Sequence, residues 1–132
     1  MEAEVSVRWE APNVLVLKLS GCLSLGAAAF VRGALNRALN GGANIEVFCD
    51  GEYLNAWESD SRKELSEALR KLRERGGNAS ILVRSKLVGT ALWAFGIARG
   101  LPLRTFSDRG AFSEALALAA KTSGEGLREG AA

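Results

Sequence analysis

Short apolar runs rich in β-branched residues alternate with segments of helical periodicity along this chain, and that alternation restricts the fold more than any other feature. The expected strands cover residues 4–10, 13–20, 45–50, 79–85 and 101–106, and the expected helices cover residues 24–40, 60–75, 86–99 and 107–120. Helical crossovers between strands imply parallel pairing with right-handed connections. The sequence therefore predicts an α/β fold of the order β-β-α-β-α-β-α-β-α with a mainly parallel central sheet.

The first two strands are predicted to form an antiparallel hairpin, because Pro12 and Asn13 supply turn chemistry between them. The first helix is expected to begin after Ser24, which can cap it, and to place Phe30 and Leu35 on its buried face. We expect the strands in sequential order with the helices mostly on one face of the sheet. The other face then needs cover from the first strand or from a second molecule.

Length and composition indicate one globular domain. The 132 residues suit a single hydrophobic core, which we assign to residues 1–120. The stretch 121–132 is rich in glycine and lacks periodicity, which predicts a flexible C-terminal tail. No apolar run reaches the roughly 18–20 residues that span a bilayer, and the acidic N-terminus does not resemble a signal peptide. We therefore expect a cytoplasmic protein without a transmembrane segment.

Charge and cysteine content argue against several functional classes. The net charge is +2, from 17 basic and 15 acidic residues mixed along the chain. The basic stripe of a nucleic-acid-binding protein is absent, so we predict no nucleic-acid partner. Cys22 and Cys49 lack the spacing of a metal or redox motif and are expected to be small core residues in a reducing compartment.

Catalytic chemistry finds little support in the residue types. The chain contains no histidine, which removes the commonest general base and every histidine-containing triad or metal site. Asp50, Glu52, Glu58 and Asp60 are expected to gather near the end of the third strand, but paired carboxylates catalyse only where the environment separates their pKa values. No glycine-rich phosphate loop of known spacing is present. We therefore predict no enzymatic activity, no cofactor and no metal site.

Residues 51–59 are expected to form a surface loop with unusually large apolar side chains. Tyr53, Leu54 and Trp57 either fold back as a lid on the core or form a contact patch for a partner. Aromatic residues dominate the binding energy of many interfaces, which keeps the second interpretation open. The carboxyl ends of parallel strands are also where α/β proteins usually meet their ligands.

The helix expected over residues 86–99 has almost no polar side chains. The stripes that contain Leu87 and Val88 suffice for a core face, and Trp93 falls on the remaining side together with Gly89 and Gly96. Glycine permits close backbone approach but costs about 1 kcal/mol in a helix interior relative to alanine. This side therefore either receives another chain, a second copy included, or is buried under the first strand or the tail.

Two cations flank the start of the same helix, where positive charge opposes the helix dipole. Arg84 and Lys86 either pair with the acidic residues Asp50, Glu52 or Glu58 of the neighbouring loop, or hold an anionic group of a ligand or partner. The sequence leaves both interpretations open.

Three stretches together resemble the STAS or SpoIIAA-like family, named for sulfate transporters and anti-sigma-factor antagonists. They are NVLVLKLSGCLSL at the start of the first helix, RKLRERGGNASILVRS, and LRTFSDRGAFSEAL. The region from ILVRSKLVG to LRTFSDRGAFSEAL looks especially like stand-alone STAS-like proteins. The resemblance covers roughly residues 4–120 and implies the SpoIIAA-like fold.

The resemblance also implies a bacterial, non-catalytic regulator that docks to a kinase or another regulatory protein. In the antagonists, phosphorylation of an Asp-Ser pair at the start of the helix after the third strand ends docking. Asp60 and Ser61 match this pair by type. The other role for Ser61 is that of a plain helix cap, since its spacing to Glu64 is that of a capping box.

The sequence thus favours a STAS-like protein–protein interaction module in signalling regulation, with a homodimer as one form of contact. The candidate interaction surface comprises Tyr53, Trp57, Lys86 and Trp93, and the candidate phospho-switch comprises Asp60 and Ser61. The alternative is a module of the same fold that binds a small hydrophobic or anionic ligand or a lipid. That function needs a pocket between the apolar helix and the aromatic loop.

Overall fold

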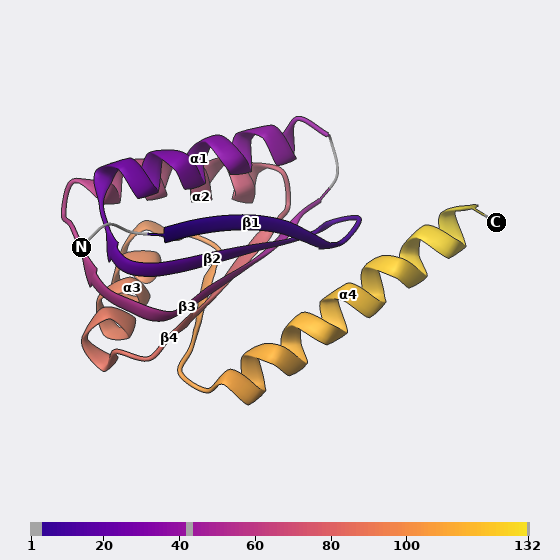
Figure 1. The fold of residues 1–132 in the computed structure, drawn as a ribbon. Helices are drawn as coiled ribbons and strands as arrows, with labels where there is room; N and C mark the ends of the chain where they lie inside the picture. The colour runs from indigo at the N-terminus through magenta and orange to yellow at the C-terminus, as the bar shows by residue number, and fades with distance from the viewer. Residues whose placement is uncertain (1–3, 42–43, 132) are drawn as a thin grey trace.

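The elements of the chain follow in the predicted order. The computed structural model describes residues 4–41 and 44–131, and side chains as far as Ser123. Along these residues (Figure 1) lie β1 (Glu4–Ala11), β2 (Val14–Leu23), α1 (Leu25–Leu39), β3 (Glu46–Trp57), α2 (Ser61–Glu74), β4 (Asn78–Val83), α3 (Lys86–Arg99), β5 (Leu103–Phe106) and α4 (Arg109–Ala131). The predicted α/β class is confirmed.

The strands form one five-stranded sheet in the sequential order β1-β2-β3-β4-β5. β1 pairs antiparallel with β2, and the register closes at Ala11 opposite Val14, so Pro12 and Asn13 form the turn as predicted. The other neighbouring strands are parallel, because a helix crosses over between each pair. The carboxyl ends of the parallel strands lie at the same end of the sheet. The segments that lead into α2 and α3 begin there.

Helices cover both faces of the sheet unequally. Leu15, Leu17 and Val47 belong to the larger core cluster, which α1, α2 and α3 cover. The alternate residues Val16 and Phe48 point to the opposite face, where Phe112 of α4 packs against them. Burial on both faces explains why these strands are continuously apolar in sequence. The expectation that the first strand or a second molecule covers this face was wrong, since α4 crosses it (Figure 1).

The aromatic segment after the third predicted strand is not a loop. β3 continues past Asp50 to Trp57, and its second half pairs with the end of β2, with Tyr53 opposite Ser20. Gly51 allows this continuation, because a Cβ there would lie only 2.9 Å from the carbonyl oxygen of Leu82. The sheet is therefore longer at the carboxyl ends of β2 and β3, where the candidate site residues lie.

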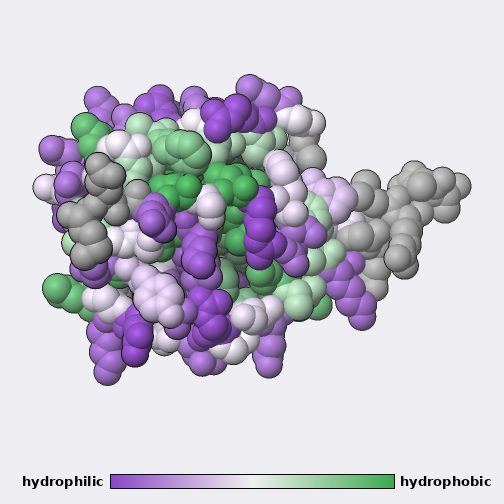
Figure 2. All heavy atoms as spheres, in the orientation of Figure 1, coloured by the Kyte–Doolittle hydropathy of each residue, from purple (hydrophilic) through white to green (hydrophobic). Residues whose placement is uncertain are grey.

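The buried face of α1 and the C-terminal end of α4 differ from the predictions. Phe30 was predicted to face the core, but it is 47% exposed, and Ala28 and Leu39 take buried positions on α1 instead. Figure 2 shows hydrophobic atoms at the surface between α1 and β1. α4 extends to Ala131 rather than ending near residue 120. Residue 132 and the side chains from 124 onward lie outside the described part, so a flexible tail over 121–132 stays a prediction.

Of the helices described in residues 4–41 and 44–131, none combines the length with the apolar character that crossing a bilayer requires.

Candidate interaction surface

The apolar helix α3 buries only one of its sides. Val88, Leu92 and Phe95 have the i, i+4, i+7 spacing of one helical face and pack into the larger core cluster. Ser85 caps the helix, since its hydroxyl accepts a hydrogen bond from the backbone N–H of Val88 at 3.2 Å. The cap and the three core residues together fix which side of α3 faces outward.

The glycines of α3 serve the sheet rather than a partner chain. A Cβ on Gly89 would lie 3.1 Å from a methyl group of Val83, and one on Gly96 would lie 3.4 Å from the Cβ of Leu103. Both glycines therefore let α3 approach β4 and β5 closely. The expectation that they lie beside Trp93 on an outward surface was wrong for Gly96, which is buried.

The outward side of α3 is apolar. Leu87 is 82% exposed, Ile97 61% and Trp93 56%. The stripe that contains Leu87 was predicted to belong to the core, and this was wrong, because the narrower stripe of Val88 fills that role. We call Leu87, Trp93 and Ile97 the α3 face. Exposed apolar side chains gathered on one helix side are typical of contact surfaces.

A hollow of about 450 Å³ adjoins the α3 face. It lies between the start of α3 and the end of β5, and its lining includes Arg84, Lys86 and Trp93. Arg84 and Lys86 are both exposed. The structure therefore brings Lys86 and Trp93 to one hollow, with Arg84 as a second cation.

The acidic residues at the end of β3 have another partner. Arg109, the first residue of α4, donates from Nη2 to Asp50 at 2.7 Å and from Nε to Glu52 at 2.8 Å. These two hydrogen bonds raise the pKa of Arg109 above its usual value. Of the two interpretations of Arg84 and Lys86, the pairing with Asp50, Glu52 or Glu58 was wrong, because within the described residues neither cation forms an ion pair.

Trp57 and Tyr53 lie in different surroundings. The indole of Trp57 packs edge-on against Phe95 with ring centroids 5.1 Å apart, and the guanidinium of Arg62 lies 5.2 Å from its ring centroid. Trp57 thus acts mainly as a lid on the core beside α3, and side chains fill the place where a ligand pocket was expected. Tyr53 is exposed, and no hydrogen bond or ring contact joins it to the α3 face among the described residues.

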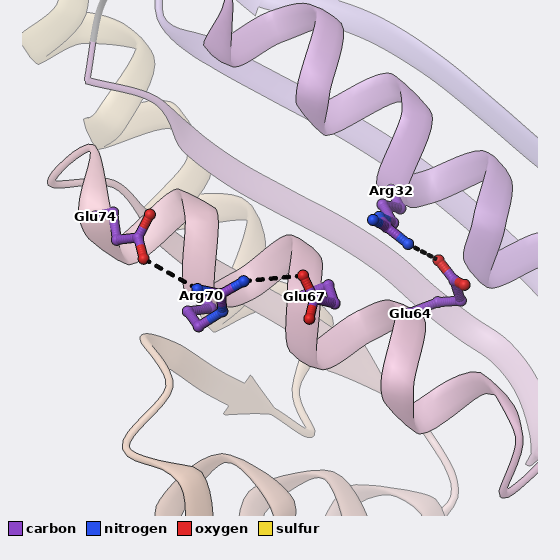
Figure 3. Close-up of polar contacts among 5 residues, drawn as sticks. All are labelled: Arg32, Glu64, Glu67, Arg70 and Glu74. Carbon is purple, nitrogen blue, oxygen red and sulfur yellow. Dashed lines mark hydrogen bonds and ion pairs between the residues drawn. The ribbon is translucent and has the colours of Figure 1, made fainter.

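Ser61 is fully buried at the start of α2. Its hydroxyl donates to the backbone carbonyl of Glu58 at 2.6 Å, whereas Asp60 occupies the cap position without a side-chain cap bond. The expected capping box was therefore wrong: Glu64 instead accepts from Nη1 of Arg32 on α1 at 2.8 Å (Figure 3). Phosphorylation of Ser61 requires this turn to open first.

The two cysteines are free and differ in burial. Cys49 is buried, and burial, followed by the negative charge of Asp50, raises the pKa of its thiol to about 12. A thiol with so high a pKa is a poor nucleophile. Cys22 is half-buried and also unpaired by any disulfide. Residues 4–41 and 44–131 contain no cluster of histidine, cysteine or carboxylate groups that could hold a metal ion.

Sequence reasoning missed Leu87, Ile97 and Arg109. Leu87 and Ile97 are ten residues apart on one side of α3, a spacing close to three helical turns that could have linked them. Arg109 stands at a helix start, where a cation is unfavourable unless acidic groups face it. That anomaly was a signal for its ion pairs with the end of β3.

Neither a protein-family model nor a curated protein sequence matches the chain. Solved structures do match it. The anti-sigma factor antagonist SpoIIAA in its unphosphorylated form aligns with a TM-score of 0.68 at 18% identity, over 88% of this chain and 97% of that one. The chain has the SpoIIAA-like fold. At this level of identity the similarity establishes the fold alone.

Two further structures support the same conclusion. The phosphorylated form of SpoIIAA, the Bacillus cell fate determinant, aligns with a TM-score of 0.64 at 17% identity, over 85% of this chain and 99% of that one. An anti-sigma factor antagonist from Mycobacterium paratuberculosis aligns with a TM-score of 0.63 at 16% identity, over 87% of this chain and 94% of that one. The predicted resemblance to SpoIIAA and other antagonist structures is confirmed at the level of fold.

Proposed function

We propose that this chain is a non-catalytic regulatory module that docks another protein, of the kinase or regulator class, through the α3 face. The observation that carries the proposal is the exposure of Leu87, Trp93 and Ile97 along one helix side. Regulatory antagonists of the same fold give the module its proposed class. The cytoplasmic location and bacterial origin predicted from the sequence stay predictions.

The charges around the α3 face indicate the chemistry of the partner. Arg84 and Lys86 are both exposed and line the same hollow as Trp93, at the end of the face where α3 begins. An apolar stripe with cations at one end is complementary to an amphipathic segment that carries acidic residues at one end of its apolar side. The partner in this proposal is therefore acidic at its contact surface.

The phospho-switch can be connected to this face through packed side chains. A phosphoryl group on Ser61 would replace its hydrogen bond to the backbone carbonyl of Glu58 and add nearly two negative charges at this turn. Trp57, one residue before Glu58, packs against Phe95 on the core side of α3. We propose that opening of this turn disturbs Trp57 and, through it, the support of the α3 face.

A capture experiment with matched variants tests the docking proposal. Leu87→Glu and Trp93→Glu should abolish retention of the partner from an extract of the native organism. Leu118→Glu is the matched control, because Leu118 is also an exposed leucine on a helix, 65% exposed on α4. The same set of retained proteins for all three variants would contradict the proposal.

Phosphate-affinity electrophoresis of the protein purified from its own cells tests the switch. A shifted band that disappears in Ser61→Ala supports it. A single unshifted band from cells under every growth condition would remove the switch and leave the docking proposal intact.

An anionic small molecule is a second candidate for the same region. The hollow of about 450 Å³ beside Arg84 and Lys86 is the observation that favours it. A ligand that survives purification should appear in native mass spectra and be lost when both cations are changed to glutamine. Spectra that show only the mass of the chain at every step of purification would argue against this candidate.

A further inference from the structure

The outer edge of β1 is open along eight residues. β1 stands first in the strand order, so only β2 neighbours it among the described strands. An open edge presents unpaired backbone N–H and C=O groups that can pair with another chain. Monomeric proteins usually blunt such edges with lysine, proline or a short strand. β1 contains neither lysine nor proline.

The opposite edge of the same sheet is blunted by these means. β5 has only four residues, and Pro102 precedes it directly. Ala79 donates to the carbonyl of Pro102, so this short stretch is already occupied on its inner side. The irregular pairing after Trp9 protects only the end of β1, and its charged residues Glu4 and Arg8 have opposite signs, so residues 4–8 form the less protected edge of the sheet. The difference indicates that the β1 edge has a use.

Apolar side chains line the β1 edge on the side of α1. Val7 is opposite Leu17 and Trp9 is opposite Leu15, so both lie on the face that α1 to α3 cover. They nevertheless remain 38% and 50% exposed. Such side chains would lose more contact with water if a further strand were added beside β1.

Phe30 of α1 points toward the same edge. Arg32 faces α2, where it pairs with Glu64. Two residues turn an α-helix by about 200°, so Phe30 points away from α2. This places the exposed Phe30 on the β1 side of α1.

The charges of β1 indicate that its occupant is a second copy. In an antiparallel pair related by a two-fold axis at Ser6, Glu4 of each copy lies opposite Arg8 of the other, and Val5 lies opposite Val7. A two-fold axis at Val7 would place Glu4 of one copy opposite Glu10 of the other. An axis at Arg8 would place the Arg8 side chains of the two copies opposite each other. Like charges directly opposite destabilise a sheet. Glu4, Ser6 and Arg8 are all exposed. Arg8 pairs with Glu10 of its own strand, and in the dimer it would exchange this partner for Glu4 of the other copy.

A two-fold axis at Trp9 also sets Arg8 opposite Glu10. There, however, the pairing of β1 with β2 is irregular between Trp9 and Ala11, and Pro12 follows directly. A bulge twists the edge and interrupts further pairing. The flat part of β1 therefore favours the axis at Ser6.

We propose that the chain forms a homodimer in which the β1 strands of two copies pair antiparallel about Ser6 and join two five-stranded sheets into one. The two-fold axis is perpendicular to the sheet, so α1 of both copies lies on the same side and Phe30 of each flanks the junction. The proposal goes beyond the docking function, because it uses the opposite edge of the sheet and leaves the α3 face free.

Sedimentation equilibrium of the full chain over a concentration series tests the dimer. Wild type and Trp93→Glu should dimerise equally, whereas Val7→Lys should raise the dissociation constant about tenfold or more, since each dimer contains the change twice. Leu118→Lys is the control for added charge, and thermal melts confirm that the variants are folded. A monomer at every concentration overturns the proposal, as does a dimer that Trp93→Glu removes and Val7→Lys preserves.

Cross-linking and a charge exchange test the register. In a Cys22→Ser background, a short bis-maleimide should link Ser6→Cys into dimers and should not link the control Ser113→Cys, an exposed serine of α4. Glu4→Arg and Arg8→Glu should each weaken the dimer, and the double variant should restore it. A dimer that cross-links equally at both serine positions, or that the double variant weakens further, overturns the Ser6 register. Loss of partner capture in the α3 variants is unaffected by either result, so the two proposals fail independently.

Discussion

Helices α2 and α3 have the same length, 14 residues, and pack on the same face of the sheet, but their outer surfaces differ in chemistry. On α2, Arg70 bridges Glu67 at 2.9 Å and Glu74 at 3.3 Å (Figure 3). On α3, Leu87 and Trp93 face outward without such partners. The buried sides are alike and the exposed sides are not, so the requirements of the core do not explain the composition of α3.

The difference shows what helical patterning can and cannot reveal. α2 separates its apolar and charged residues cleanly, so its buried face of Ala68, Leu69 and Leu72 follows from the sequence. A helix that is apolar all round is usually buried all round. α3 is buried on one side only, and its remaining apolar residues therefore need a reason outside the fold of the single chain.

The largest effect is expected where the two helices are alike. Leu72→Ala on α2 and Leu92→Ala on α3 both remove a side chain that is almost fully buried. Each should lower the free energy of unfolding by about 2–5 kcal/mol, because a cavity remains. Urea denaturation measures both losses. A loss under about 1 kcal/mol for Leu92→Ala would show that α3 is not held by its core side, and the comparison would fail.

A smaller effect is expected from the close approach of α3 to β5. Gly96→Val would push against Leu103 and should cost about 1–3 kcal/mol. Gly33→Ala is the control, since a Cβ there meets only the end of the Arg37 side chain, and it should stabilise the helix by about 0.5–1 kcal/mol. Thermal denaturation should show a lower midpoint for Gly96→Val and a higher midpoint for Gly33→Ala than for wild type. Equal shifts would contradict the packing role of Gly96.

A change confined to the outer surface of α3 should hardly affect stability. Leu87→Lys should alter the free energy of unfolding by no more than about 0.5 kcal/mol, because Leu87 makes few contacts within the chain. Denaturation curves of this variant and of wild type should superimpose while partner capture is lost. A destabilisation comparable to that of Leu92→Ala would place Leu87 in the core and contradict the α3 face.

The smallest effect concerns the charged surface of α2. The hydrogen bond and positive charge of Arg70 hold the pKa of Glu67 below its usual value. A lowered pKa in the folded state stabilises the protein above the ordinary pKa of glutamate, and this contribution is lost as the pH falls through the folded value. Carboxyl NMR titration should show the pKa of Glu67 rising in Arg70→Gln. Salt should shrink the difference, because the pair is exposed. An unchanged pKa would show that Arg70 does not pair with Glu67 in solution.

The order of elements could be predicted because local signals agreed with the global fold. Ser24 caps α1 as expected, with its hydroxyl accepting from Ala27 at 3.2 Å. The carboxylate of Asp108 does the same for α4, where it accepts from the backbone N–H of Ala111 at 2.9 Å. Caps and turns depend on neighbouring residues alone, and the strands between them are apolar enough to be recognised.

The site could be predicted only in part, because its details depend on distant residues. Trp93 was expected at the surface as one of two alternatives, and it lies there. The pairing of Asp50 with Arg109 joins residues far apart in sequence, and no local pattern reveals it. Whether Leu87 or Val88 faces the sheet is decided by the rotation of α3, which the fit of Gly96 against β5 sets. When a helix is apolar on every side, its sequence does not show which side faces the sheet.

The fluorescence of the three tryptophans can report on separate regions of the protein. Trp57 has its Nε1 buried with no acceptor among the described residues, so its emission should lie at short wavelength and resist quenching by iodide. Trp9 and Trp93 should emit at longer wavelength and be quenched readily. Single-tryptophan versions would then register events at β1 and at α3 as separate blue shifts, without any attached dye.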